Sequence, residues 1–72
     1  MSYIIVAEVR LSDEENFHGD KSKVEARVLS ERSGVIEFDV PGVFGEEKKR
    51  TLDLCKSLIE AGFISFSIRH SY

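Results

Sequence analysis

The segment between Gly45 and Gly62 most constrains the fold, because it is the one long stretch whose apolar residues have helical spacing. These apolar residues are Leu52, Cys55, Leu58 and Ile59. Two acidic residues at its start suit the positive end of a helix dipole, and Gly62 suits its end. The pattern predicts one amphipathic helix over about residues 46–61.

Four other segments alternate apolar and polar residues with the period of two that is typical of β-strands. They cover residues 3–11, 23–31, 35–40 and 63–70. The first begins apolar on both faces, since Ile4 and Val6 lie between apolar residues of the other parity. A strand buried on both faces belongs inside a sheet, so we expect the first strand to be central.

The predicted fold class is α+β: a two-layer βββαβ sandwich with one four-stranded mixed sheet, covered on one face by a single helix. A chain of this length forms a single small α+β domain over residues 1–72. The crossover through the helix makes the last strand parallel to the third. The last strand can lie beside the third strand or beside the first, and we favour the order 3-2-1-4.

The turn between the second and third strands follows from their register. If Val28 and Phe38 both face the core, the turn must be a three-residue loop, whose last residue, Gly34, suits a left-handed backbone conformation. The register then gives two exposed pairs, Arg27 with Asp39 and Leu29 with Glu37.

The charge and the cysteine content argue against several classes of function. The net charge is −3, with acids and bases interleaved, which argues against binding nucleic acid through its phosphates. A single cysteine excludes an intrachain disulfide, a CxxC redox pair and a thiolate-rich zinc site. The first residues resemble neither a signal peptide nor a membrane span, so we expect a cytoplasmic, reducing location.

The loop from Ser12 to Ser22 is unusually long. Most hairpin loops have about two to five residues, and longer loops in small domains are often functional. The carboxylates of this loop and His18 lack the spacing of an EF-hand or a zinc site, so we expect no metal. Phe17 either folds back over the sheet or projects, with His18 beside it, as an aromatic anchor for a partner.

Two other places were candidates for chemistry. The glycine-containing loop of residues 41–50 lacks the GK[ST] of a phosphate-binding loop, and Glu46 and Glu47 would repel an anion there. A pairing of Cys55 with His70 lacks a third orienting group and an oxyanion donor. We therefore predict no catalytic residues and no cofactor.

The sheet face away from the helix is predicted to carry an apolar cluster within a mixed-charge surface. With the first two strands paired, this cluster consists of Ile4, Val6, Leu29 and Val35. The last strand lies at an edge and contains neither proline nor lysine, so it can accept a strand from another chain. Arg69 projects from this strand toward the same open face.

These features predict a small, non-enzymatic protein-binding module that acts as an inhibitor, regulator or accessory subunit of a larger intracellular protein or complex, as phage-type accessory proteins do. Its partner is another protein or a second copy of the chain. The predicted interface residues are Ile4, Val6, Phe17, His18, Leu29, Val35 and Arg69. Two alternatives are a nucleic-acid-associated module that uses the open sheet face and a small Cys/His or metal-assisted enzyme.

Overall fold

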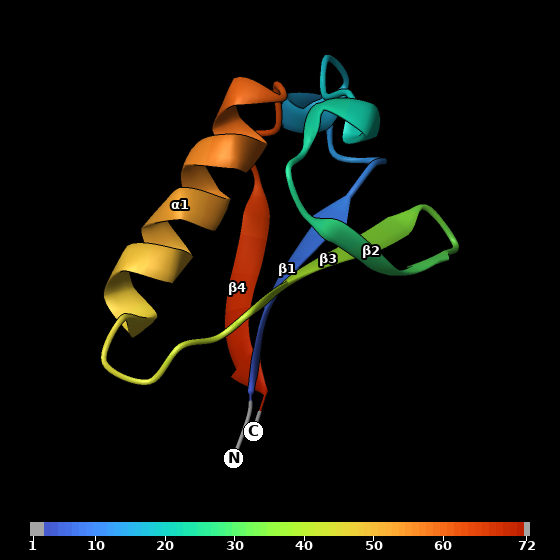
Figure 1. Ribbon diagram of the computed structural model, residues 1–72. Helices are drawn as coiled ribbons and strands as arrows, with labels where there is room; N and C mark the ends of the chain where they lie inside the picture. Colours follow the sequence, from blue (N-terminus) through green and yellow to red (C-terminus); the bar gives the residue numbers. More distant parts are fainter. Residues whose placement is uncertain (1–2, 72) are drawn as a thin grey trace.

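Four strands and one α-helix form in the order that the sequence predicts (Figure 1). The structure is a computed structural model that describes residues 3–71. Along the chain the main elements are β1 (Ile4–Arg10), β2 (Arg27–Arg32), β3 (Val35–Pro41), α1 (Glu47–Glu60) and β4 (Phe66–Ser71). Two short 3-10 helices, η1 (Glu14–Asn16) and η2 (Lys21–Lys23), lie between β1 and β2. The predicted α+β class, with a four-stranded sheet and one α-helix, is confirmed.

The strand order is β2-β3-β1-β4, and every neighbouring pair is antiparallel. As predicted, β1 is central and β4 lies beside it at the sheet edge. Two features correct the expected mixed sheet of order 3-2-1-4. β3, rather than β2, is the other neighbour of β1, and β4 runs antiparallel to β1.

Both corrections have one physical cause, which is the connection between β1 and β2. The prediction treated this connection as a hairpin loop, which would reverse the chain direction. Instead residues 11–26 carry the chain back across the sheet, so that β2 runs parallel to β1 and leaves a place between them for β3. The resulting order and directions are those of the split β-α-β (ferredoxin-like) topology, with an irregular crossover in place of its first helix.

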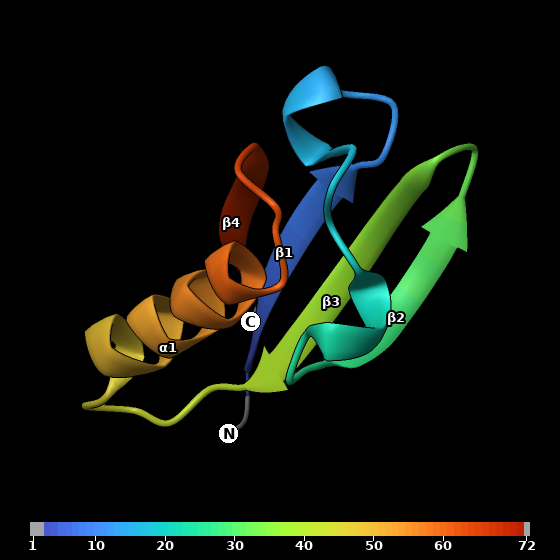
Figure 2. The same cartoon turned by 90° about the horizontal axis from the view of Figure 1, so that it is seen from above.

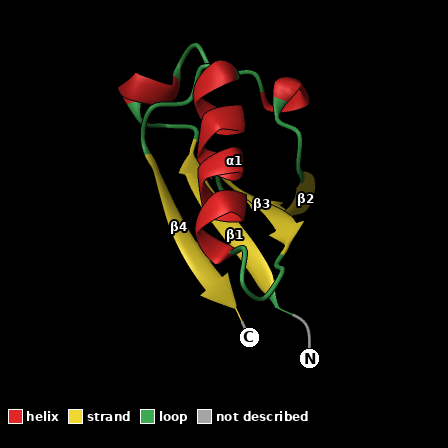
Figure 3. Cartoon of the chain, turned by 60° about the vertical axis from the view of Figure 1, so that its left-hand side comes forward, coloured by secondary structure: helices red, strands yellow, loops and turns green. Residues whose placement is uncertain are grey.

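The crossover packs on the same side of the sheet as α1 (Figures 2 and 3). Val24 is 8% exposed and belongs to the core that α1 covers. The Asp20 N–H donates to the Ala61 carbonyl at 2.8 Å, just past the end of the helix. Gly62 has a φ of 98°, and a Cβ there would lie 2.6 Å from the His18 carbonyl oxygen. The length of the crossover therefore serves to close one end of the core.

The core lies between α1, the crossover and one sheet face. Its residues are Tyr3, Ile5, Ala7, Val9, Val24, Ile36, Phe38, Leu54, Leu58, Ala61 and Phe63. From α1 the core receives Leu54 and Leu58, whereas Leu52 and Ile59 are 62% and 61% exposed. The predicted apolar stripe of the helix is therefore wrong in its orientation, and the buried face is turned by about 90° from it.

The β2–β3 hairpin has the predicted strand register at its open end, but its turn differs from the predicted one. Val28 does lie opposite Phe38, and Arg27 lies opposite Asp39. Val28, however, is 48% exposed on the edge strand β2 and is not part of the core. The turn, however, has two residues, Ser33 and Gly34, both with positive φ, at 51° and 76°. A register shift between Val28 and Ser30, typical of a β-bulge, supplies the extra residue. The predicted three-residue loop and the Leu29–Glu37 pair are therefore wrong, and Ser30 lies opposite Glu37.

Replacing Ser33 should stabilise the fold. A serine in the left-handed region is strained, whereas Asn followed by Gly is the favoured pair for a two-residue hairpin turn with two positive φ angles. We expect Ser33→Asn to raise the free energy of unfolding by about 0.5–1 kcal/mol in urea denaturation. As a contrast, Gly34→Ala should lower it. A destabilised Ser33→Asn variant would contradict this turn geometry.

Candidate binding surfaces

Asn16 is the polar residue that holds the crossover against the start of β4. Its side chain is buried, with the residue 3% exposed. The amide nitrogen donates to the carbonyl oxygens of Arg10 at 2.9 Å and Ser65 at 2.8 Å. The amide oxygen accepts from the backbone N–H groups of Ile64 and Ser65, both at 3.0 Å. Both donors and both acceptor positions of the amide are used, so the backbone around Asn16 is firmly held.

Phe17 follows Asn16 directly and projects from this anchored turn. Its side chain is exposed, at 65%, so of its two expected orientations the outward one is observed. Ile64, whose N–H binds Asn16, is 70% exposed. A hollow of about 360 Å³ beside Phe17 is lined in part by Leu11 and Phe63. We call the group Leu11, Phe17, Phe63 and Ile64 the Phe17 end.

The open sheet face, opposite α1, is tied together by a polar network. Arg69 of β4 reaches the Glu37 carboxylate of β3 at 2.9 Å and that of Glu8 on β1 at 3.9 Å. The Ser30 hydroxyl of β2 donates to Glu37 at 2.7 Å. Glu8 and Glu37 lie directly opposite each other, so Arg69 offsets a repulsion between like charges. The hydrogen bonds from Ser30 and then Arg69 hold the pKa of Glu37 below its usual value.

A second ion pair on this face lies toward the start of β2. The Arg27 guanidinium binds the Asp39 carboxylate through two nitrogens, with a 2.9 Å distance between Nε and Oδ1. Asp39 is 3% exposed, and its hydrogen bond and charge raise the pKa of Arg27. Val6 lies in register between Asp39 and Arg69 and has no exposed surface. Polar side chains flank this valine on the open face, so it is not available to a partner.

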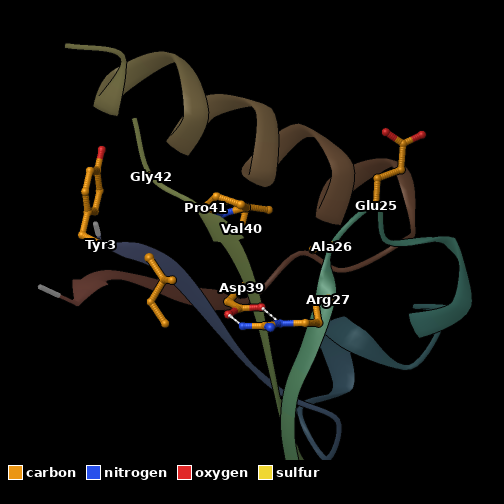
Figure 4. A pocket seen from close by; sticks show the side chains of 9 residues that line it. Tyr3, Glu25, Ala26, Arg27, Asp39, Val40, Pro41 and Gly42 are labelled. Carbon is orange, nitrogen blue, oxygen red and sulfur yellow. Dashed lines mark hydrogen bonds and ion pairs between the residues drawn. The ribbon is translucent and has the colours of Figure 1, made fainter. Parts of the chain in front are cut away.

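A pocket of about 500 Å³ opens where β3 ends and β1 and β2 begin (Figure 4). Its walls include Tyr3, Val40 and Gly42, and the Arg27–Asp39 pair lies at one side. The two charged groups of this pair already satisfy each other. The pocket thus offers a shallow, largely apolar hollow, and no nucleophile with an adjacent base is found among its described lining residues.

The predicted apolar cluster of four residues does not form. β3 separates β1 from β2, so Leu29 cannot lie beside Ile4 or Val6. Ile4 pairs with Pro41 at one end of the sheet, whereas Val35 pairs with Arg10 at the other. Ile4 and Val35 are half-buried, and Leu29 is 41% exposed at the bulge on the β2 edge. His18 is exposed next to Phe17, and Arg69 is exposed but engaged by carboxylates.

Five exposed apolar residues were not predicted as surface residues, namely Val28, Phe44, Leu52, Ile59 and Ile64. Leu52 and Ile59 were expected in the core because they recur at a helical spacing. Leu54, Leu58 and Ala61 form a second helical series, and this series is the one that is buried. That alternative series was the signal that could have identified Leu52 and Ile59 as surface residues.

The positions considered for metal, catalytic or membrane roles lie as follows. Within residues 3–71, no three His, Cys, Asp or Glu side chains come together as a metal site would require. His70 Nε2 lies 3.0 Å from Thr51 Oγ1, and its ring stacks on Tyr3 with centroids 5.8 Å apart. Cys55 is a half-buried free thiol. No helix in the described part of the chain is long and apolar enough to cross a membrane.

Comparisons with protein-family models, curated proteins and solved structures found no match to this chain. The surfaces described above are therefore the basis for inferring function. Two of them stand out: the Phe17 end and the pocket beside Tyr3.

The polar network predicts how stability depends on pH. Because the pKa of Glu37 is lowered in the folded protein, its contribution is complete above the unfolded-state pKa, about 4.3 for glutamate, and is lost as the pH falls through the folded-state value. We expect the Tm to fall in this acid range, and to fall less steeply in Ser30→Ala. Calorimetry between pH 2 and 7 measures both slopes. Equal slopes in the two proteins would contradict the assignment.

Removing the Asn16 side chain should strongly destabilise the fold. Asn16→Ala leaves two backbone N–H groups and two carbonyls without these partners, which we expect to cost about 2–3 kcal/mol of unfolding free energy. Glu15→Ala, an exposed position in the same turn, is the matched control and should change stability by less than about 0.5 kcal/mol. Similar effects of the two substitutions in chemical denaturation would refute the anchoring role.

Proposed function

We propose that this chain is a small, non-enzymatic protein-binding module that acts as an inhibitor, regulator or accessory subunit of a larger intracellular protein in the cytoplasm. The observation that carries the proposal is the exposed Phe17 on a turn anchored by Asn16. The partner binds at the Phe17 end. The single half-buried thiol, with no disulfide partner, is consistent with a reducing compartment.

The Phe17 end has the properties of a binding hot spot. Large aromatic side chains surrounded by polar residues contribute most of the energy in many protein interfaces. Phe17 lines the hollow and is 65% exposed, and Ile64, whose N–H binds the neighbouring Asn16, is 70% exposed, so we expect one partner to cover both side chains. The hydrogen bonds of Asn16 order this backbone before binding, which reduces the entropy lost on association.

The charges around the Phe17 end indicate what the partner offers. Glu14 and Glu15 are exposed in η1, directly before Asn16 and Phe17. A partner surface with an apolar pocket and a basic rim would complement them. Such rim charges act mainly on the association rate and on the choice of partner.

The nucleic-acid alternative has less support. It relied on arginines of the open sheet face, but Arg27 is paired with Asp39, and Arg69 with Glu37 and Glu8. Phosphate groups would have to replace these carboxylates. The outward residues of β1, β3 and β4 include no aromatic side chain on which a base could stack.

The proposal is tested by affinity capture from the source cell with wild type and two phenylalanine variants. Phe17→Ala should lose the captured protein, with a binding cost of about 2 kcal/mol, or a roughly 30-fold higher Kd. Phe44→Ala is the matched control, because Phe44 is 56% exposed but precedes α1, away from the Phe17 end.

Circular dichroism on all three proteins separates loss of binding from loss of fold. Since Phe17 is largely exposed, its replacement should leave the Tm close to that of wild type. If Phe17→Ala retains the captured protein at the wild-type level, the Phe17 end is not the binding site.

A further inference from the structure

The outer edge of β4 is an unprotected strand edge. β4 is the last strand of the sheet, and it pairs regularly with β1 from Phe66 to Ser71 without a register shift. Its sequence, FSIRHS, contains none of the prolines, lysines or acidic residues that discourage edge pairing. The other edge differs, because β2 has the register shift at Leu29 and carries the charged residues Arg27, Glu31 and Arg32, whereas β4 carries Arg69. Of the two edges, β4 is the one suited to accept a further strand.

An apolar stripe of α1 lies on the same side of the molecule. Thr51 contacts His70 of β4, so this flank of the helix faces the β4 edge (Figure 3). The opposite flank faces the crossover, where the Ser57 hydroxyl accepts from the Glu25 N–H at 2.8 Å. Cys55 and Ile59 follow Thr51 at intervals of four residues, and Leu52 precedes Cys55 by three, so these three residues form one stripe next to Thr51 on the outer part of this flank. We call these three residues the α1 stripe.

We propose that two copies of this chain form a twofold symmetric dimer, in which the two β4 strands pair antiparallel edge to edge and the two α1 stripes pack against each other. The dimer has one continuous eight-stranded sheet with two neighbouring helices on one face. It uses a surface that the proposed binding at the Phe17 end leaves free.

The positions of the strand and the helix agree on one symmetry axis. The Thr51–His70 contact shows that Thr51 of α1 and His70 of β4 lie at the same height along the strand direction. Four to five residues of helix from Thr51 advance about 7 Å, which matches about two residues of strand and leads from His70 back to Ile68. Ile68 is close to the middle of β4. At this level the axis passes α1 midway between Leu52 and Ile59. Leu52 of one copy therefore contacts Ile59 of the other.

The charges of the chain are compatible with this pairing. With Ile68 at the axis, Ser67 lies opposite Arg69 of the second copy and Phe66 opposite His70, so no arginine faces an arginine. Lys49 and Glu60, which are both exposed, lie about 100° around α1 from the centre of the stripe, so they stay in solvent when the two stripes pack.

The size that a stable interface needs can be compared with the extent of the proposed contact. Such interfaces bury about 800 Å² per partner, roughly a sixth of the 4918 Å² surface of this chain. The proposed contact extends over both layers, from a six-residue strand edge to the flank of a helix about 21 Å long. Burying the stripe adds apolar area to a domain whose single core is small.

Sedimentation equilibrium at about 1–100 µM protein tests the dimer. Wild type should approach twice the 8.2 kDa chain mass. Leu52→Glu and Ile59→Lys should each raise the dimer dissociation constant at least tenfold, and mixing the two variants should restore association because the new charges then face each other. Leu29→Glu, the same kind of change at the β2 edge, is the matched control and should leave the mass unchanged.

The lone cysteine gives a second readout. Cys55 lies next to the proposed axis, so a short bis-maleimide should join two chains through their Cys55 thiols, and Leu52→Glu should abolish this product. A monomeric wild type at 100 µM, a dimer unaffected by Leu52→Glu, or one disrupted by Leu29→Glu would overturn the proposal. Phe17→Ala should remain dimeric, so failure of the Phe17 site and failure of the dimer are separate outcomes.

Discussion

The hydrogen bonds of the buried Asn16 amide are the interaction on which the arrangement depends. They join the end of β1 and the crossover that follows it to the entry to β4, which lies 48 or 49 residues further along the chain. By fixing the crossover over the end of the core, they allow β2 to lie beyond β3 and leave β1 in the centre of the sheet. The same bonds place Phe17 and Ile64 at the surface. One polar side chain thus determines both a fold feature and the surface most suited to binding.

Periodicity was enough to predict each strand and the helix, because alternation and helical spacing are local properties of the chain. It was not enough for the strand order, which depended on whether residues 12–22 reverse the chain or carry it back across the sheet. No local pattern distinguishes these two paths, since the deciding contacts of Asn16 reach residues 64 and 65. Parity likewise predicted a three-residue turn on the premise that Val28 and Phe38 lie opposite each other, but a two-residue turn followed by a bulge gives the same pairing.

The candidate sites also divide into those that local sequence could predict and those that depend on tertiary contacts. Phe17 was identified from loop length and composition alone, and it is exposed on a held turn. The predicted cluster around Val6 does not form, because its prediction assumed that β1 pairs with β2, whereas β3 lies between them. The exposed stripe of α1 was missed because two helical series of apolar residues overlap in this short helix. Packing against the sheet decides which series is buried, and that packing is a tertiary property.

The open face and the outer side of β4 show how the chain distributes its charges. Most arginine and glutamate side chains of the open face neutralise each other within the face, so they need no partner. The β4 edge and the α1 stripe carry few charges, and the one arginine of β4, Arg69, is already held by Glu37. In an antiparallel β4 pair, the two Phe17 ends lie at opposite ends of the joined strands, because each is attached to the start of its own β4 through Asn16. A dimer therefore presents two identical binding ends, and a repetitive or dimeric partner would be held by both at once, with a gain in effective affinity that needs no new contact.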